Sequence, residues 1–132
     1  MDAAPPDLPR VRLVAAWAKV TVVAWIIVMA ALIAVAVTGR NVGKPAWWIG
    51  PESNPKFFML WFLPFVLPFA VIVLAFRASR FVPIVGVVAS VAVAGIAATD
   101  IAGSPGVALL EGVIALSGLC IALATFAGLE RR

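Results

Sequence analysis

A single acidic residue, Glu111, interrupts the apolar segment 107–129, within the run VALLEGVIAL. A carboxylate buried in hydrocarbon costs several kcal/mol unless it is paired or protonated. Such a side chain can couple a proton or cation to transport, hold a partner group, or lie close enough to the surface to be solvated. Glu111 is therefore the first candidate for a functional side chain.

The depth and the face of Glu111 both favour a structural role. Counted from Pro105 at ~1.5 Å per residue, Glu111 lies ~9 Å along a helix, in the outer third of the hydrocarbon. The opposite face of this helix is bulky, which suits lipid, whereas small residues permit close packing. The residues that share a face with Glu111 are small, namely Ala108, Ala115, Gly118 and Ala122. We therefore expect Glu111 to point at protein in a structural pair or hydrogen bond within the assembly, ahead of solvation and of proton or cation coupling.

Basic residues near the same end of the molecule supply the expected partners of Glu111. These are Arg40 or Lys44 in the loop and Lys56 before the second apolar segment, unless the partner belongs to another subunit. Asp100 lies at the same membrane level, and we expect it to compete for these cations.

The remaining residue types exclude most other chemistry. The chain has no histidine and one cysteine, Cys120, which excludes a bis-histidine haem, a histidine proton relay, a CxxC pair and a thiolate metal cluster. Carboxylates do not cluster as a catalytic site requires. We predict no enzyme, no cofactor and no metal site. The net charge of +4 is typical of membrane flanks, and no nucleic-acid partner is expected.

The elements that must position Glu111 are membrane helices. The chain is 64% hydrophobic and 12% charged, against about 45–50% and about 25% for a soluble domain. Four apolar segments, at roughly 11–37, 57–76, 82–99 and 105–129, approach the ~20 residues needed to cross a bilayer. Lipid requires backbone groups to be satisfied within each segment, so these are predicted helices. The first is longer than the about 7–15-residue core of a secretion signal, so we expect it to be retained as an anchor.

Short connections between the last three segments predict antiparallel neighbours. The expected fold is an all-α membrane protein, an up-down bundle of four transmembrane helices in a single domain of residues 1–132, with one outer loop at 38–56. Lysine and arginine near helix ends mark the cytoplasmic side. Seven of the 10 basic residues lie on the side of the two termini and the 77–80 turn. The charge distribution therefore predicts an inner (plasma) membrane protein with both termini in the cytoplasm.

The outer loop contains two adjacent tryptophans, Trp47 and Trp48, beside basic residues. Tryptophan favours the membrane–water interface, so the loop is expected to lie on the bundle as an interfacial anchor. Adjacent tryptophans near arginine and lysine also resemble an interaction hot spot, which leaves a docking surface as the alternative.

Two helices carry internal features that affect packing. Pro64 and Pro68 in the second helix lie four residues apart and should kink it by removing backbone hydrogen bonds. We favour a shape feature over a substrate path, because nothing polar accompanies the prolines. In the third helix, small residues recur every fourth position, a pattern that indicates a tight helix–helix contact within this chain or with another protein. They are Gly86, Ser90, Ala94 and Ala98.

The length and helix number are similar to those of small four-helix multidrug exporters. Those exporters carry an essential acid in the first helix, where this chain has Lys19 and no acid. The comparison therefore fails at the functional residue. A small homo-oligomeric transporter that uses Glu111 stays an alternative.

The helices rich in alanine, valine and glycine, such as VASVAVAGIAATD and IALATFAGLERR, together with the absence of Tyr and His, resemble small actinobacterial four-helix membrane proteins. The resemblance lies in the amino-acid composition along the whole chain and rests on no specific motif. It implies an accessory subunit of a larger complex, for instance a Mce-type lipid importer or, as an alternative, a respiratory complex. The expected partners are other integral membrane proteins, such as a permease subunit, and membrane lipids.

Overall fold

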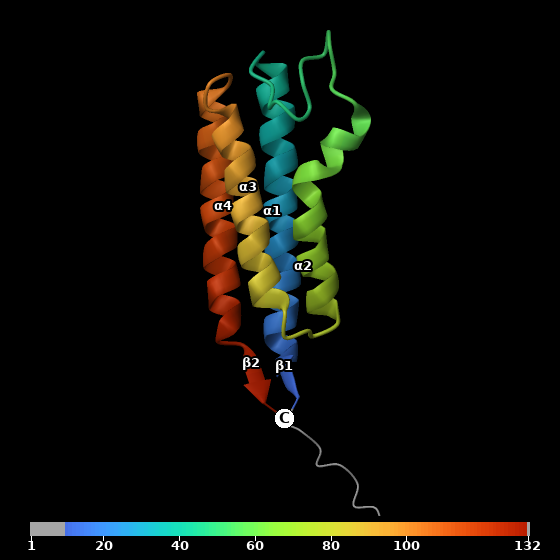
Figure 1. The fold of residues 1–132 in the computed structure, drawn as a ribbon, viewed down its shortest axis with the longest axis vertical. Coiled ribbons are helices and arrows are strands. Elements are labelled where there is room, and N and C mark those ends of the chain that lie inside the picture. Colours follow the sequence, from blue (N-terminus) through green and yellow to red (C-terminus); the bar gives the residue numbers. More distant parts are fainter. Residues whose placement is uncertain (1–9, 132) are drawn as a thin grey trace, which may run out of the picture.

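The computed structural model describes residues 10–131 and places four long helices side by side (Figure 1). They are α1 (Ala15–Asn41), the 3-10 helix η1 (Phe58–Phe65) continued by α2 (Val66–Phe76), α3 (Val82–Asp100) and α4 (Pro105–Phe126). All four are long and apolar enough to cross a membrane. The chain is therefore a multi-pass membrane protein, and the predicted all-α four-helix bundle is confirmed. Residues 1–9 and Arg132, which the predicted domain and the charge count include, lie outside the described residues.

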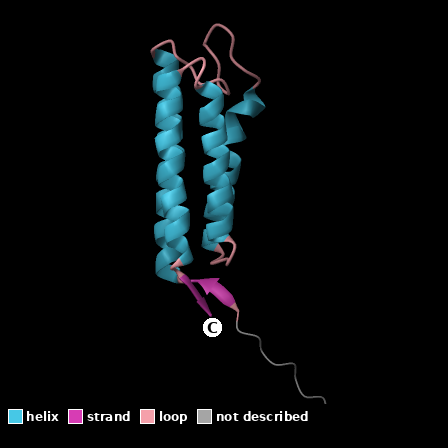
Figure 2. Ribbon diagram, turned by 60° about the vertical axis from the view of Figure 1, so that its left-hand side comes forward, coloured by secondary structure: helices cyan, strands magenta, loops and turns pink. Residues whose placement is uncertain are grey.

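Each helix packs against two neighbours. Helix α1 contacts α2 and α4, and α3 contacts the same two helices, with the α3–α4 pair in the most extensive contact. The long loop 42–57 and the short turn 101–104 lie at one end of the bundle, here called the loop end (Figure 2). The opposite end, here called the strand end, holds two short strands. The core between the helices is mainly aliphatic, with the indole of Trp25 at its centre.

The two strands, β1 (Val11–Leu13) and β2 (Leu129–Arg131), pair in antiparallel register. This ladder corrects two predicted helix bounds. Helix α1 begins at Ala15 and not at residue 11, and α4 ends at Phe126 and not at residue 129, because the flanking residues satisfy their backbone groups against each other. Val14 N also donates to the Gly128 carbonyl at 2.9 Å. Gly128 is needed here because an added Cβ would clash with the ring of Trp17.

At the loop end, α1 runs one turn beyond its predicted end and finishes at Asn41. Val42 N donates to the Thr38 carbonyl at 3.1 Å, and Gly43 N donates to the Arg40 carbonyl at the same distance. Gly43 has φ +73°, the left-handed conformation that glycine favours just after a helix. The loop is therefore 42–57 rather than 38–56.

The two prolines of the second span change its helix type. Pro64 and Pro68 lack the N–H groups that would bond to the carbonyls of Leu60 and Pro64. Residues 58–65 wind as a 3-10 helix, and α-helical geometry begins at Val66. Figure 1 shows the chain changing direction where η1 meets α2. The expected kink in one continuous helix is thus a junction between two helix types, with both prolines buried.

Candidate functional site

The strongest candidate site is a pair of buried acids at the loop end. Asp100 is the last residue of α3, and Glu111 lies in the second turn of α4. The turn 101–104 reverses the chain so tightly that Ser104 N donates to the Asp100 carbonyl at 2.8 Å. The two carboxyl groups therefore become neighbours that interact directly. Asp100 is 3% exposed and Glu111 is 1% exposed.

The loop closes over this pair and supplies its hydrogen-bond donors. Trp47 N donates to Asp100 Oδ1 at 2.8 Å, and Trp48 Nε1 donates to Glu111 Oε1 at 3.1 Å. Two consecutive loop residues thus hold acids from two different helices. Ser104 Oγ donates to the Pro45 carbonyl at 3.1 Å, which fixes the same stretch of loop to the α3–α4 turn.

Local backbone geometry brings the tryptophans into place. Lys44 N donates to the Gly39 carbonyl at 2.8 Å, and a Cβ added to Gly39 would lie 2.7 Å from the Lys44 carbonyl oxygen. A glycine is therefore required where the loop crosses the end of α1. Ile49 N then donates to the Ala46 carbonyl at 3.2 Å, which forms the turn that carries Trp47 and Trp48.

Trp48 is buried as a core residue. Its side chain is 2% exposed, and its ring meets that of Phe65 edge-on at 5.8 Å between centroids. Trp47 is half-buried, and its Nε1 has no hydrogen-bond partner among the described residues. The expected anchoring of the loop on the bundle is therefore made by hydrogen bonds as well as by aromatic packing.

The expected cations do not pair with Glu111. The Arg40 guanidinium lies over the Trp61 ring at 5.8 Å from its centroid, and the side chains of Lys44 and Lys56 are exposed. Across residues 10–131 no arginine or lysine forms an ion pair with either acid. The competition expected between Asp100 and Glu111 is replaced by direct contact between them. Within this chain Glu111 therefore forms a hydrogen bond instead of an ion pair, because N–H groups of the loop occupy the positions that Arg40, Lys44 or Lys56 were expected to take.

The small residues around Glu111 on α4 are all buried. They are Ala108, Ala115, Gly118 and Ala122, and they face the interior of the bundle. The pattern on α3 divides: Gly86 and Ser90 are buried, whereas Ala94 and Ala98 are exposed. The four α3 positions therefore do not form one continuous tight contact within the bundle.

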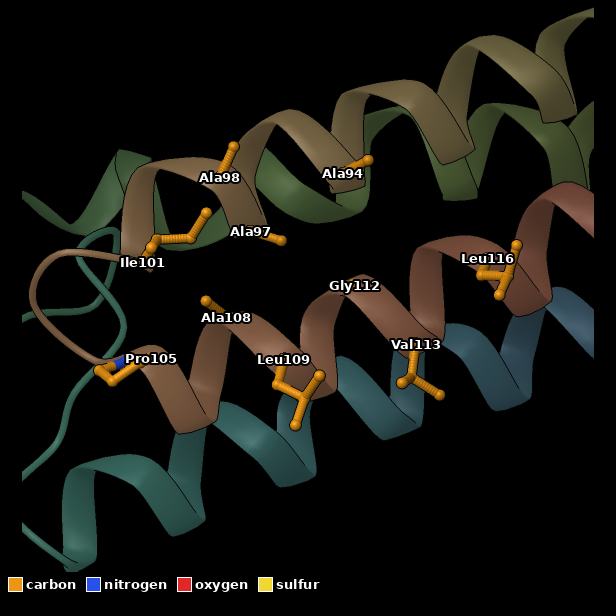
Figure 3. Close-up of a pocket in the computed structure, with 10 residues that line it drawn as sticks. All are labelled: Ala94, Ala97, Ala98, Ile101, Pro105, Ala108, Leu109, Gly112, Val113 and Leu116. Carbon is orange, nitrogen blue, oxygen red and sulfur yellow. The ribbon is translucent and has the colours of Figure 1, made fainter.

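The exposed alanines of α3 border a groove between α3 and α4, with a volume of about 510 Å³. Figure 3 shows Ala94 and Ala98 beside this groove, across from Leu109, Val113 and Leu116 of α4. Gly112 of α4 also lines the groove and has no side chain to fill it. The groove faces outward from the bundle and is lined almost entirely by apolar atoms.

The middle of the bundle is filled by Trp25 of α1. Its side chain is 1% exposed. A Cβ added to Gly86 would lie 3.4 Å from the Trp25 ring, and one added to Gly118 would lie 3.3 Å from it. The indole is thus inserted between a glycine of α3 and a glycine of α4. Ser90 Oγ donates back to the Gly86 carbonyl at 2.9 Å, within its own helix.

Sequence reasoning missed the partner of Glu111 and the role of Trp25. The signal for the first was present, because an indole N–H is a donor without charge and Trp48 lies in the loop that must cover this end. Trp25 could not be paired with Gly86 and Gly118 from the sequence, since that contact joins three helices.

The fold and the site define a class: a four-helix, multi-pass membrane protein with an acidic pair sealed by its own loop. Comparison with protein-family models, with curated proteins and with solved structures gives no match.

Proposed function

We propose that this chain is a non-enzymatic accessory subunit that stabilises a larger complex in the inner (plasma) membrane. The observation that carries the proposal is the groove between α3 and α4. Helices in lipid associate through close van der Waals packing, which small residues permit. Because Ala94, Ala98 and Gly112 line this groove, a helix of another integral membrane protein can approach it closely.

The interior of the bundle supports this proposal over the transporter alternative. The buried pair of Asp100 and Glu111 favours transport, because intramembrane acids often mark ion or substrate paths. Below the pair, however, Trp25 packs between Gly86 and Gly118 so closely that a Cβ added to Gly118 would lie 3.3 Å from its ring. A transporter needs a polar route past this point, which the closely packed ring of Trp25 opposes.

The orientation and the type of complex are finer proposals. The excess of basic residues at the strand end supports a cytoplasmic location for both termini. The composition of the helices, which are rich in alanine, valine and glycine, supports a Mce-type lipid importer ahead of a respiratory complex. In such an importer this chain would pack on a permease subunit. Membrane lipids cover the bulky faces that the partner leaves free.

Purification through a tag on this chain, in gentle detergent from its native membrane, tests the proposal. Wild type is expected to recover integral membrane proteins of different sequence. The double variant Ala94→Leu/Ala98→Leu is expected to lose most of them, because two isobutyl groups fill the edge of the groove. The matched control is Ala30→Leu/Ala34→Leu, which makes the same change on exposed positions of α1, at the same spacing.

The comparison of the two double variants decides where the partner binds. Equal recovery from both would show that the α3–α4 groove is not the contact surface. Loss from both would point to a general defect in insertion. Recovery of partners with the α1 variant alone supports the groove.

A further inference from the structure

Each acid of the buried pair keeps one oxygen atom without a hydrogen-bond partner. These atoms are Asp100 Oδ2 and Glu111 Oε2, and both are shielded from solvent. The other oxygen of each carboxyl group already accepts an N–H from the loop. The unpartnered oxygens belong to two carboxyl groups that lie close enough to interact, and no described residue donates a hydrogen bond to either atom.

The charges around the pair do not neutralise it. Helix α1 brings Arg40 to this end, where the guanidinium lies over the Trp61 ring. Charged side chains of the loop 42–57 are exposed, and η1 carries none. Asp100 and Glu111 are the charged residues that α3 and α4 contribute. The exposed charged residues of the loop are Lys44, Glu52 and Lys56.

Two ionised carboxylates cannot share a buried site of this kind without a large electrostatic cost. One proton removes that cost in two ways. It cancels one of the two charges, and it turns one acceptor into an O–H donor aimed at the other acceptor. A proton bound to either oxygen therefore satisfies both atoms that lack partners.

We propose that Asp100 and Glu111 form a proton-binding site, with one proton held between Oδ2 and Oε2. The site lies directly beneath the loop and above the packed ring of Trp25, so it exchanges its proton with the loop end of the bundle. The proton holds the loop closed: with it bound, the pair carries one negative charge, which the N–H groups of Trp47 and Trp48 stabilise. Its loss leaves two adjacent negative charges and loosens the loop.

The sign of the pH response follows from this arrangement. The closed loop belongs to the protonated pair, so closure is complete at low pH and is lost as the pH rises. The inference does not depend on the accessory role, because proton binding is measured on the isolated chain and partner recovery on the complex.

Infrared difference spectroscopy of the purified wild-type chain in lipid vesicles tests the site. A protonated carboxyl group has a C=O stretching band that is absent from a carboxylate and shifts in D2O. We expect this band at pH 7 and its loss at higher pH. Tryptophan fluorescence should change over the same pH range in wild type, because Trp47 and Trp48 both lie in the loop that covers the pair.

Two variants assign the band. Glu111→Gln and Asp100→Asn should each abolish it at pH 7, because an amide N–H replaces the shared proton and the remaining acid ionises. Glu52→Gln removes an exposed loop acid and should leave the band unchanged. A wild-type spectrum without a protonated carboxyl band at pH 7 would overturn the proposal. So would a band that appears only after Na⁺ and K⁺ are removed, since the site would then hold a monovalent cation.

Discussion

Neutral donors hold the acidic side chains at the loop end of the bundle. Glu111 Oε1 accepts from the Trp48 indole at 3.1 Å, and Asp100 Oδ1 accepts from the Trp47 backbone at 2.8 Å. Hydrogen bonds to charged groups contribute about 1.5–3 kcal/mol each. The loop is therefore fastened to both helices of the α3–α4 pair by consecutive residues, and its position depends on both acids.

Substitutions at Glu111 should separate its hydrogen bonding from its charge. Glu111→Gln keeps an oxygen for Trp48 and supplies an N–H toward Asp100, so its free energy of unfolding should change by less than about 1 kcal/mol. Glu111→Leu leaves the Trp48 indole buried without an acceptor and should cost about 1–3 kcal/mol. Unfolding in detergent micelles, followed by far-ultraviolet circular dichroism, measures both. Equal losses from the two substitutions would contradict the hydrogen-bonding role of Glu111.

The sequence predicted the face of Glu111 but not its partner. Its small neighbours on α4 follow from helical periodicity, which is a local property. The position of Trp48 depends on how the loop 42–57 folds back, on the close approach at Gly39 and on the turn from Ala46 to Ile49. The loop then meets Asp100 and Glu111, which are 53 and 63 residues away from Trp47 and Trp48, and the loop sequence alone does not specify these contacts.

Helices α3 and α4 show why spacing decides which small residues are buried. One residue turns the helix by about 100°, so positions four apart advance by about 40° beyond a full turn. From Gly86 to Ala98 this drift reaches about 120°, which carries Ala94 and Ala98 out of the bundle. On α4 the steps alternate between four and three residues, and the small residues from Ala108 to Ala122 stay on the buried face.

Glycines that contact Trp25 should be more sensitive than exposed glycines on the same helix. A Cβ at Gly86 would lie 2.9 Å from the Ala122 Cβ, whereas one at Gly95 meets nothing within 4 Å. Gly86→Val should therefore destabilise the bundle by about 1–3 kcal/mol through overpacking. Gly95→Val is the matched control and should have little effect. Thermal unfolding of both variants in the same detergent decides the point, and similar melting temperatures would refute the close packing at Gly86.

Hydropathy predicts the overall fold of the molecule more directly than it predicts the structure at the two ends of the bundle. Four apolar segments of membrane-spanning length and short connections were enough to predict the up-down bundle, because lipid leaves helices as the workable choice for these segments. The β1–β2 ladder was not predicted, since it joins residues 11–13 to residues 129–131 across the full length of the chain. The switch to a 3-10 helix before Pro68 was also missed, although the prolines marked its position.

Most of the chain lies within the membrane-spanning bundle, and the loop that covers one end is engaged with its own helices. Other molecules in the membrane can therefore contact the outer surface of the bundle, which includes the groove between α3 and α4. We therefore propose that the role of this chain is assembly with other membrane proteins.

Native mass spectrometry of the tagged chain, released from its own membrane in gentle detergent, tests that claim most directly. The chain has a mass of 13.8 kDa. An accessory subunit predicts assemblies whose masses require at least one protein of different sequence, identified by dissociation of the intact complex. Spectra that contain only whole-number multiples of 13.8 kDa would contradict the account and support a homo-oligomer.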